Sequence, residues 1–323
     1  MMKGFLFASV SLLAIGFAPA ASAGGSSSFT NQTGSNQTLS VDQSTGNNDY
    51  VGFNGQSFLQ QNGGGSGGNN INIFQGGSGN VFGWGFGGSF QSGTENYANI
   101  TQTGTGSGVN LQQTGSRNGV SNDHDGQTET LSTEISENEI SFINQTASYS
   151  TVNVFENGNG NAFFINQLNG FFDNLTVNQQ GNENYVTMSQ DGSNLGASVW
   201  QIGNFNTVNS TQSGSYNTLT AYQLGSNNLL SNTQSSFGNT AFFVQQGDSH
   251  QLTNNQTGAG NNAVAYQYGV SQVASLTQSG NSNSIFGVQN GPATNTVTVN
   301  QSTSGNVANY NQNGSGNTAT IHQ

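Results

Sequence analysis

The chain has 323 residues, of which 5% are charged and 31% are hydrophobic, and it contains no cysteine. Because globular domains are usually about 45–50% apolar, this composition argues against a conventional enzyme core. Fourteen acidic residues stand against two basic ones, Lys3 and Arg117. Electrostatic binding of nucleic acid is therefore excluded, since phosphate neutralisation needs Lys and Arg. Without cysteine, backbone hydrogen bonds must hold the fold.

Residues 1–23 have the layout of a secretory signal peptide. Lys3 precedes an apolar run over 5–17, and residues 21–23 read Ala-Ser-Ala. The apolar run is too short for a membrane-spanning helix of about 20 residues. We therefore expect a secreted mature chain that begins at Gly24 and has no membrane anchor.

Repeats of unequal quality follow the leader. Residues 24–94 form a Gly-rich segment with imperfect repeats, and residues 95–138 carry further repeats that end in an acidic break. This break lacks the spacing of a Ca²⁺-binding loop, so we interpret it as a charged interruption that limits premature stacking. The stretch 62–93 has a broken register, and we expect it to lie outside the regular repeat. Regular repeats then cover 139–323.

An 11-residue unit runs through this regular region, with one extra residue beside Pro292. Glutamine recurs once per unit, asparagine often follows five positions later, and an apolar residue comes two positions after the asparagine. The residues between strands are rich in Gly, Ser and Asn, which suit tight turns with positive φ. Each unit therefore predicts a strand and a turn, with glutamine, asparagine and the apolar residue on one inward face.

Stacking at about 4.8 Å would join these inward amides into ladders along the molecule. The glutamine position is occupied by Gln190, Gln201, Gln212, Gln223, Gln234, Gln245, Gln256, Gln267, Gln278, Gln289, Gln301, Gln312 and Gln323. The asparagine position is occupied by Asn206, Asn217, Asn228, Asn239, Asn261, Asn283, Asn306 and Asn317.

The outward residues reveal a true period of 22. Every second strand carries aromatic and β-branched residues outside, whereas the intervening strands carry Ser, Thr and Asn at the same sites. This alternation predicts an all-β, amyloid-like, two-sheet β-solenoid whose rung is strand, turn, strand, turn. We name one set of outward residues the aromatic stripe and expect it to form lateral contacts. The stripe comprises Trp200, Tyr222, Phe242, Val244, Val264, Tyr266, Phe286 and Val288.

The pattern Gln-x-Gly-x-x-Asn-x-Ala-x-x-x-Gln resembles the repeat of the curlin family, the amyloid subunits of bacterial curli fibres. The likeness spans 145–323, recurs at 96–102 and 113–118, and is partial at 32–43. The resemblance implies an extracellular cell-surface fibre that serves biofilm matrix and adhesion. It also implies a nucleator subunit, a periplasmic chaperone and an outer-membrane secretion channel as partners, besides further copies of the chain itself.

No motif predicts catalysis, a cofactor site or a metal site. The Gly-rich run 83–88 has dinucleotide-fingerprint spacing but lacks a strand and helix around it. His124 takes a glutamine position, His250 an asparagine position and His322 an outward position, so we interpret them as repeat substitutions rather than metal ligands. We expect a non-enzymatic fibre subunit whose end rungs template the next molecule. The alternatives are a soluble ice-binding solenoid, through the Ser/Thr/Asn face, and a surface adhesin.

Overall fold

The computed structural model describes residues 140–323, except 159, and a series of shorter segments between 27 and 125. The expected signal peptide lies outside the described residues, as do most of the Gly-rich run 83–88 and of the acidic break. All regular elements in the described part are β-strands. None of its elements is a helix long and apolar enough to span a membrane.

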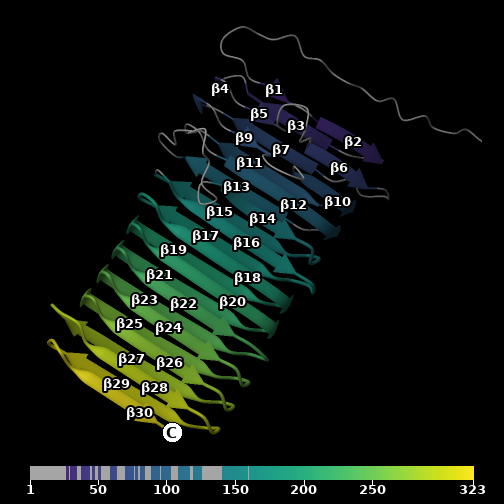
Figure 1. Ribbon diagram of the computed structural model, residues 1–323. Coiled ribbons are helices and arrows are strands. Elements are labelled where there is room, and N and C mark those ends of the chain that lie inside the picture. The colour runs from purple at the N-terminus through teal and green to yellow at the C-terminus, as the bar shows by residue number, and fades with distance from the viewer. Residues whose placement is uncertain are drawn as a thin grey trace, which may run out of the picture.

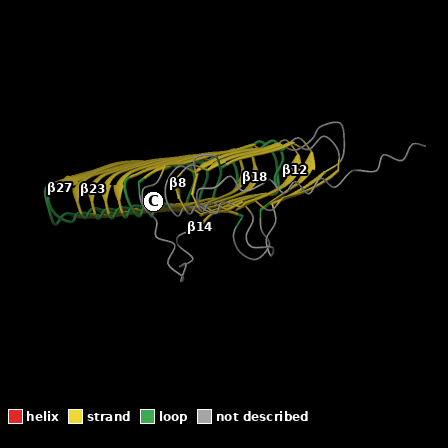
Figure 2. Ribbon diagram, turned by 90° about the horizontal axis from the view of Figure 1, so that it is seen from above, coloured by secondary structure: helices red, strands yellow, loops and turns green. Residues whose placement is uncertain are grey.

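Two long parallel sheets build the structure (Figure 1). From β14 onward, the even-numbered strands pair in sheet A and the odd-numbered strands pair in sheet B, so the chain crosses between sheets after every strand. Figure 2 shows the sheets as two layers joined by loops along their edges. The predicted two-sheet β-solenoid is confirmed.

The regular part contains β14 (Ile140–Gln145), β15 (Thr151–Asn157), β16 (Ala162–Leu168), β17 (Asn174–Gln180), β18 (Tyr185–Ser193), β19 (Gly196–Asn204), β20 (Thr207–Ser215), β21 (Thr218–Ser226), β22 (Leu229–Gln234), β23 (Thr240–Asp248), β24 (Gln251–Gln256), β25 (Asn262–Val270), β26 (Val273–Gln278), β27 (Ser284–Gly291), β28 (Thr296–Gln301), β29 (Val307–Asn313) and β30 (Thr318–His322).

The N-terminal strands are β1 (Ser27–Ser28), β2 (Thr30–Gly34), β3 (Thr38–Asp42), β4 (Gly46–Asn47), β5 (Tyr50–Val51), β6 (Leu59–Gly63), β7 (Asn70–Gln75), β8 (Gly77–Ser78), β9 (Val81–Phe82), β10 (Phe90–Thr94), β11 (Tyr97–Gln102), β12 (Gly108–Ser116) and β13 (Gly119–Asp125). All but β4 and β8, which pair with each other, belong to the same two sheets.

The register repeats every 22 residues. In sheet A, Gln190 pairs with Gln212, Gln212 with Gln234, and Gln234 with Gln256. The offset becomes 23 between Gln278 and Gln301, where the extra residue near Pro292 is absorbed in a turn. Identical side chains therefore stay in register despite the insertion.

The expectation that 62–93 lies outside the repeat is wrong for β7. This strand pairs in register with β3 on one side and with β11 on the other. Its sequence Asn-Ile-Asn-Ile-Phe-Gln alternates polar and apolar residues, so Ile71 and Ile73 are buried between the sheets. Strand alternation, which the search for the Gln-x-Gly spacing overlooked, places this segment in the solenoid.

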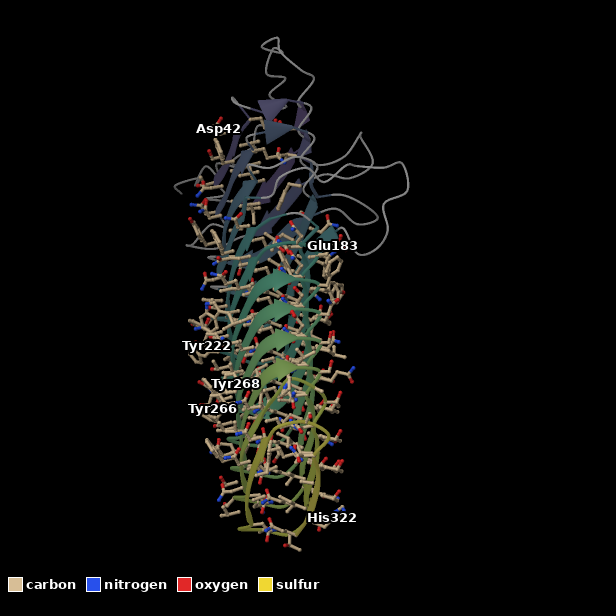
Figure 3. The ribbon with its side chains drawn as sticks, turned by 90° about the vertical axis from the view of Figure 1, so that its left-hand side faces the viewer. Asp42, Glu183, Tyr222, Tyr266, Tyr268 and His322 are labelled. Carbon is tan, nitrogen blue, oxygen red and sulfur yellow. The ribbon has the colours of Figure 1, made fainter. Side chains whose placement is uncertain are left out.

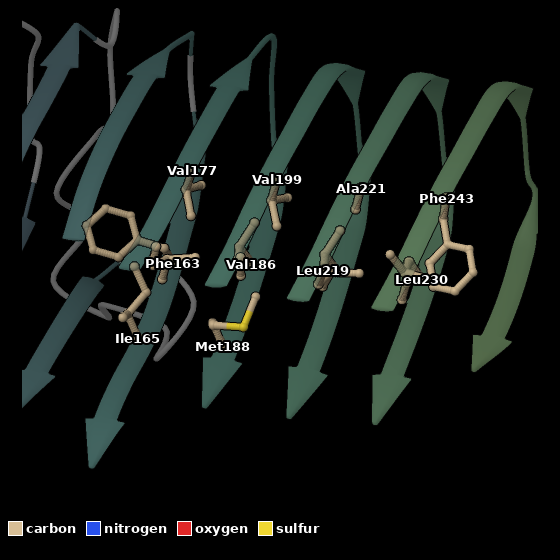
Figure 4. Close-up of a cluster of buried hydrophobic side chains, with 14 of the residues drawn as sticks. Phe163, Ile165, Val177, Val186, Met188, Val199, Leu219, Ala221, Leu230 and Phe243 are labelled. Atoms are coloured by element: carbon tan, nitrogen blue, oxygen red, sulfur yellow. The ribbon is translucent and has the colours of Figure 1, made fainter. Parts of the chain in front are cut away.

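A narrow apolar core runs between the sheets (Figure 4). The predicted apolar position is buried from Val208 to Ala308. Large and small residues alternate at a second inward position of sheet B, where Phe243 is flanked by alanines in the neighbouring strands. Farther along, a Cβ on Gly287 would lie 1.8 Å from Cζ of Tyr310. The ring of Tyr310 therefore uses the space that the glycine leaves.

Candidate functional site

Glutamine side chains form two hydrogen-bonded columns between the sheets. In sheet A, each Nε2 donates to Oε1 of the glutamine one rung later, at 2.7–3.0 Å from Gln145 to Gln323. The sheet B column runs from Gln179 to Gln312 at 2.8–3.0 Å. The structure buries the glutamines of the predicted ladder almost completely but leaves Gln323 exposed, because β30 is the terminal strand of its sheet.

Each glutamine also ties its own sheet to the opposite one. Gln201 Nε2 donates to the carbonyl oxygen of Tyr185 at 3.1 Å, and Gln234 Nε2 donates to that of Thr218 at 2.9 Å. One amide thus binds the next rung and the start of a strand in the facing sheet. Since buried amides are stabilising only when all their groups are paired, the repeated sequence is what permits a polar interior.

The corner asparagines lie at a different place from the one expected. Asn206 precedes β20 instead of belonging to its inward face, although its side chain is buried. Its Nδ2 donates to Oδ1 of Asn184 at 3.1 Å and to the carbonyl of Gly225 at 2.8 Å, and its Oδ1 accepts from the backbone N–H of Asn228 at 3.1 Å. Asparagine therefore fastens one turn to the turns before and after it.

The other predicted asparagines occupy equivalent corners, and their burial depends on their distance from the terminal strands. Those buried are Asn217, Asn228, Asn239, Asn261 and Asn283. Asn306 is half-buried and Asn317 is exposed, since both lie beside the terminal strands β29 and β30.

Further residues belong to these corners although the Gln-to-Asn spacing does not identify them. Gln272 donates from Nε2 to the carbonyl of Gly291 at 3.1 Å and accepts at Oε1 from Nδ2 of Asn295 at 2.8 Å. A longer side chain here does the work of an asparagine. Asn295 could have been found by shifting the count by one residue at Pro292.

The sheet B column changes character at Glu156, which pairs in register with Gln179. Both residues are fully buried. Oε1 of Gln179 has no hydrogen-bond partner, because a carboxylate at the preceding rung brings no N–H where a glutamine would. The regular donor-to-acceptor chain of sheet B therefore begins at Gln179.

Glycine is required at one turn position. Gly203, Gly225 and Gly247 have φ of +123°, +121° and +128°. A Cβ on any of them would lie 1.9–2.1 Å from the carbonyl oxygen of the glycine one rung later. These glycines therefore permit the close backbone stacking of successive turns.

The aromatic stripe lies on the outer face of sheet B. Tyr222 and Tyr266 project from one side of the solenoid, whereas Glu183 and His322 lie on the other side (Figure 3). The rings of Trp200 and Tyr222 stack at a centroid distance of 4.7 Å. The ring contacts continue through the stripe to Phe286 at 5.9–6.0 Å. All stripe residues are half-buried except Phe286, which is exposed.

Outward aromatics are not restricted to sheet B along the whole solenoid. Phe142 in β14 and Phe164 in β16 belong to sheet A, and their rings stack at 5.1 Å. The expected segregation of aromatic and hydroxyl faces therefore holds only from β18 onward. It fails earlier because the repeats near residue 140 carry phenylalanine where later ones carry Thr, Asn or Ser.

Exposed aromatics also occur in turns that lead from sheet A to sheet B. Tyr149 contacts Phe172 at 5.2 Å, and Tyr216 contacts Phe237 at 5.3 Å between ring centroids. Sequence reasoning did not identify them, because turns rich in Gly, Ser and Asn give no reason to expect aromatic pairs. Their spacing of 21–23 residues is the signal that could have found them.

The described residues contain no group of three or more His, Cys, Asp or Glu side chains that could hold a metal ion. No family model matches the chain, and no curated protein matches its sequence. The arrangement of the described residues therefore carries the functional argument.

Proposed function

We propose that the chain is a non-enzymatic structural subunit that polymerises end to end into an extracellular, curlin-like amyloid fibre. The observation that carries the proposal is the repeated pairing of identical amides on a parallel, in-register stack. A further copy can continue the same pattern at a terminal rung. Parallel in-register stacking with amide ladders is the arrangement that stabilises amyloid.

The terminal strands offer groups for this continuation. Interior Gln289 Nε2 donates to Gln312 Oε1 and to the carbonyls of Val273 and Asn295. By contrast, Gln312 Nε2 has a single partner, the carbonyl of Thr296 at 2.9 Å. The remaining N–H of Gln312 can donate to a glutamine of a second copy, and the backbone edge of β29 can pair with a strand of that copy.

Low charge favours the same role. Between residues 184 and 323, the only carboxylate side chains are Asp191 and Asp248, and no Lys or Arg occurs. Stacked copies therefore bring few like charges into register, which would otherwise oppose assembly. By the resemblance, we propose secretion through an outer-membrane channel with a chaperone and a nucleator, and a role in biofilm matrix and adhesion.

Incubation of the purified chain without residues 1–23 tests the proposal. We expect Thioflavin-positive fibres with a cross-β reflection at about 4.7–4.8 Å. Persistent monomer at high concentration, with no such reflection, would contradict it. Thermal hysteresis of a monomer would instead support ice binding, and carbohydrate binding by a monomer would support a soluble adhesin.

We further expect the aromatic stripe to control bundling. Replacing Tyr222, Phe242, Tyr266 and Phe286 by threonine should give thinner, less bundled fibrils that elongate at nearly the parental rate, because the stripe runs parallel to the stack and away from its ends. Electron microscopy and seeded elongation measure the two effects. The control replaces Thr187, Thr211, Thr233 and Thr277 on sheet A by serine. Unchanged bundling with collapsed elongation would show that the stripe acts in the core.

A further inference from the structure

Two titratable side chains occupy corner positions that are amides in most other rungs. Asp173 accepts at Oδ1 from the backbone N–H of Leu195 at 3.0 Å, as Asn217 Oδ1 accepts from that of Asn239 at 2.9 Å. His250 follows Asn228 in the other corner column, where its backbone N–H donates to Oδ1 of Asn228 at 3.0 Å. Asp173 is 1% exposed and His250 is fully buried.

The second carboxyl oxygen of Asp173 stands where an asparagine carries Nδ2. In Asn217, Nδ2 donates to the carbonyl of Ser213 at 2.7 Å. Oδ2 of Asp173 is buried without a hydrogen-bond partner. A carboxylate has no proton to donate there, whereas a neutral carboxyl has one. Burial, opposed by the Leu195 N–H and assisted by the charge of Asp191, raises the pKa of Asp173 to about 6.

His250 meets the opposite requirement. Its Nδ1 lies 3.1 Å from the backbone N–H of Gln272, and its Nε2 lies 3.1 Å from the carbonyl oxygen of Gln246. The neutral tautomer with hydrogen on Nε2 satisfies both contacts and thus imitates an asparagine. A second proton would set Nδ1–H against the N–H of Gln272. Burial accordingly lowers the pKa of His250.

We propose that these residues form two proton-dependent corners of opposite sign, so that acidification stabilises the turn at Asp173 and destabilises the turn at His250. Asp191 is the charged group that faces Asp173 from the following turn, and Tyr149 is the titratable residue of the preceding one. Asp248 lies in the turn of His250 itself. The neighbouring turns 226–228 and 270–272 contain no titratable residue.

The signs follow from linkage. The pKa of Asp173 is higher in the folded chain than its ordinary value of 3.8, so its stabilisation is complete below pH 3.8 and is lost as the pH rises through about 6. The pKa of His250 is below its ordinary 6.5, so its stabilisation is present above pH 6.5 and is lost as the pH falls. A global unfolding curve combines the two slopes, and a local measurement separates them.

Native-state hydrogen exchange of the full chain without residues 1–23, kept monomeric, makes that separation. After correction for intrinsic exchange, lowering the pH from 7.5 to 5 should decrease the opening equilibrium at the Leu195 amide by about tenfold, as a shift of about two pKa units implies. Opening at the Gln272 amide should increase. Because the measurement uses the monomer, it holds whether or not fibres form.

Two variants identify the responsible groups. Asp173→Asn should abolish the pH response at Leu195 and leave the response at Gln272 intact. His250→Asn should do the reverse, since each asparagine is the ordinary residue of its column. Responses of equal sign at both amides, or responses that survive their own variant, would overturn the inference.

Discussion

Replacing Gln234 by lysine is expected to reduce the stability of the solenoid and to slow fibre formation severely. Gln234 is fully buried and donates to both Gln256 Oε1 and the carbonyl of Thr218. Lysine would bury an uncompensated charge and leave the oxygen of its neighbour unpaired, a loss of about 3–5 kcal/mol. Chemical unfolding of the monomer and Thioflavin kinetics measure the two consequences.

The neighbouring residue supplies the matched control. Thr233 lies one position earlier in β22 and faces solvent, so Thr233→Lys should change stability by no more than about 0.5 kcal/mol. Asn239→Lys should behave like Gln234→Lys, since Asn239 is buried and donates to the carbonyl of Ser235. Equal effects at Thr233 and Gln234 would contradict the division into inward and outward positions.

Replacing Gly225 by alanine is expected to unfold the turns on either side of β21. Gly225 has φ of +121°, and an added Cβ would lie 2.1 Å from the carbonyl oxygen of Gly247. That oxygen belongs to the backbone of the next rung, so relief would require the rungs to separate and their ladders to break. The loss should therefore exceed the cost of about 1–2 kcal/mol for a left-handed alanine alone. Circular dichroism during chemical unfolding measures it.

Gly238→Ala separates the two contributions. Gly238 also has positive φ, +67°, but an added Cβ would meet nothing within 4 Å. This variant should show only the conformational cost, about 1–2 kcal/mol. If Gly225→Ala proved as mild as Gly238→Ala, the close stacking of successive glycine carbonyls would not be a constraint on the fold.

Identical residues at constant spacing made much of the solenoid predictable from sequence. Gln190 and Gln212 announce the same environment because a parallel stack repeats each side chain in register. The corner role of Asn206 was less predictable, since strand alternation gives no sign of where the chain begins to turn. Its hydrogen bonds to two neighbouring turns depend on the three-dimensional stack.

Substitutions limited prediction for a different physical reason. His250 and Gln272 fill asparagine corners with different atoms at suitable distances, and spacing alone cannot judge whether such a replacement completes the contacts. Residues 70–75 carried strand alternation but not the glycine spacing, so the broken register of 62–93 hid them. Tyr149 and Phe172 show that turns can bear aromatic pairs when successive turns lie in register.

The amides of the interior are oriented in two opposing directions. Glutamine Nε2 groups donate toward the C-terminal rung, as from Gln201 to Gln223, whereas asparagine Nδ2 groups of one corner donate toward the N-terminal rung, as from Asn228 to Asn206. Because each amide is a dipole, the two sets offset each other along the axis. A stack of any length then accumulates less electrostatic polarisation than glutamine ladders alone would produce. The free energy of adding a rung should consequently depend little on how many rungs already exist.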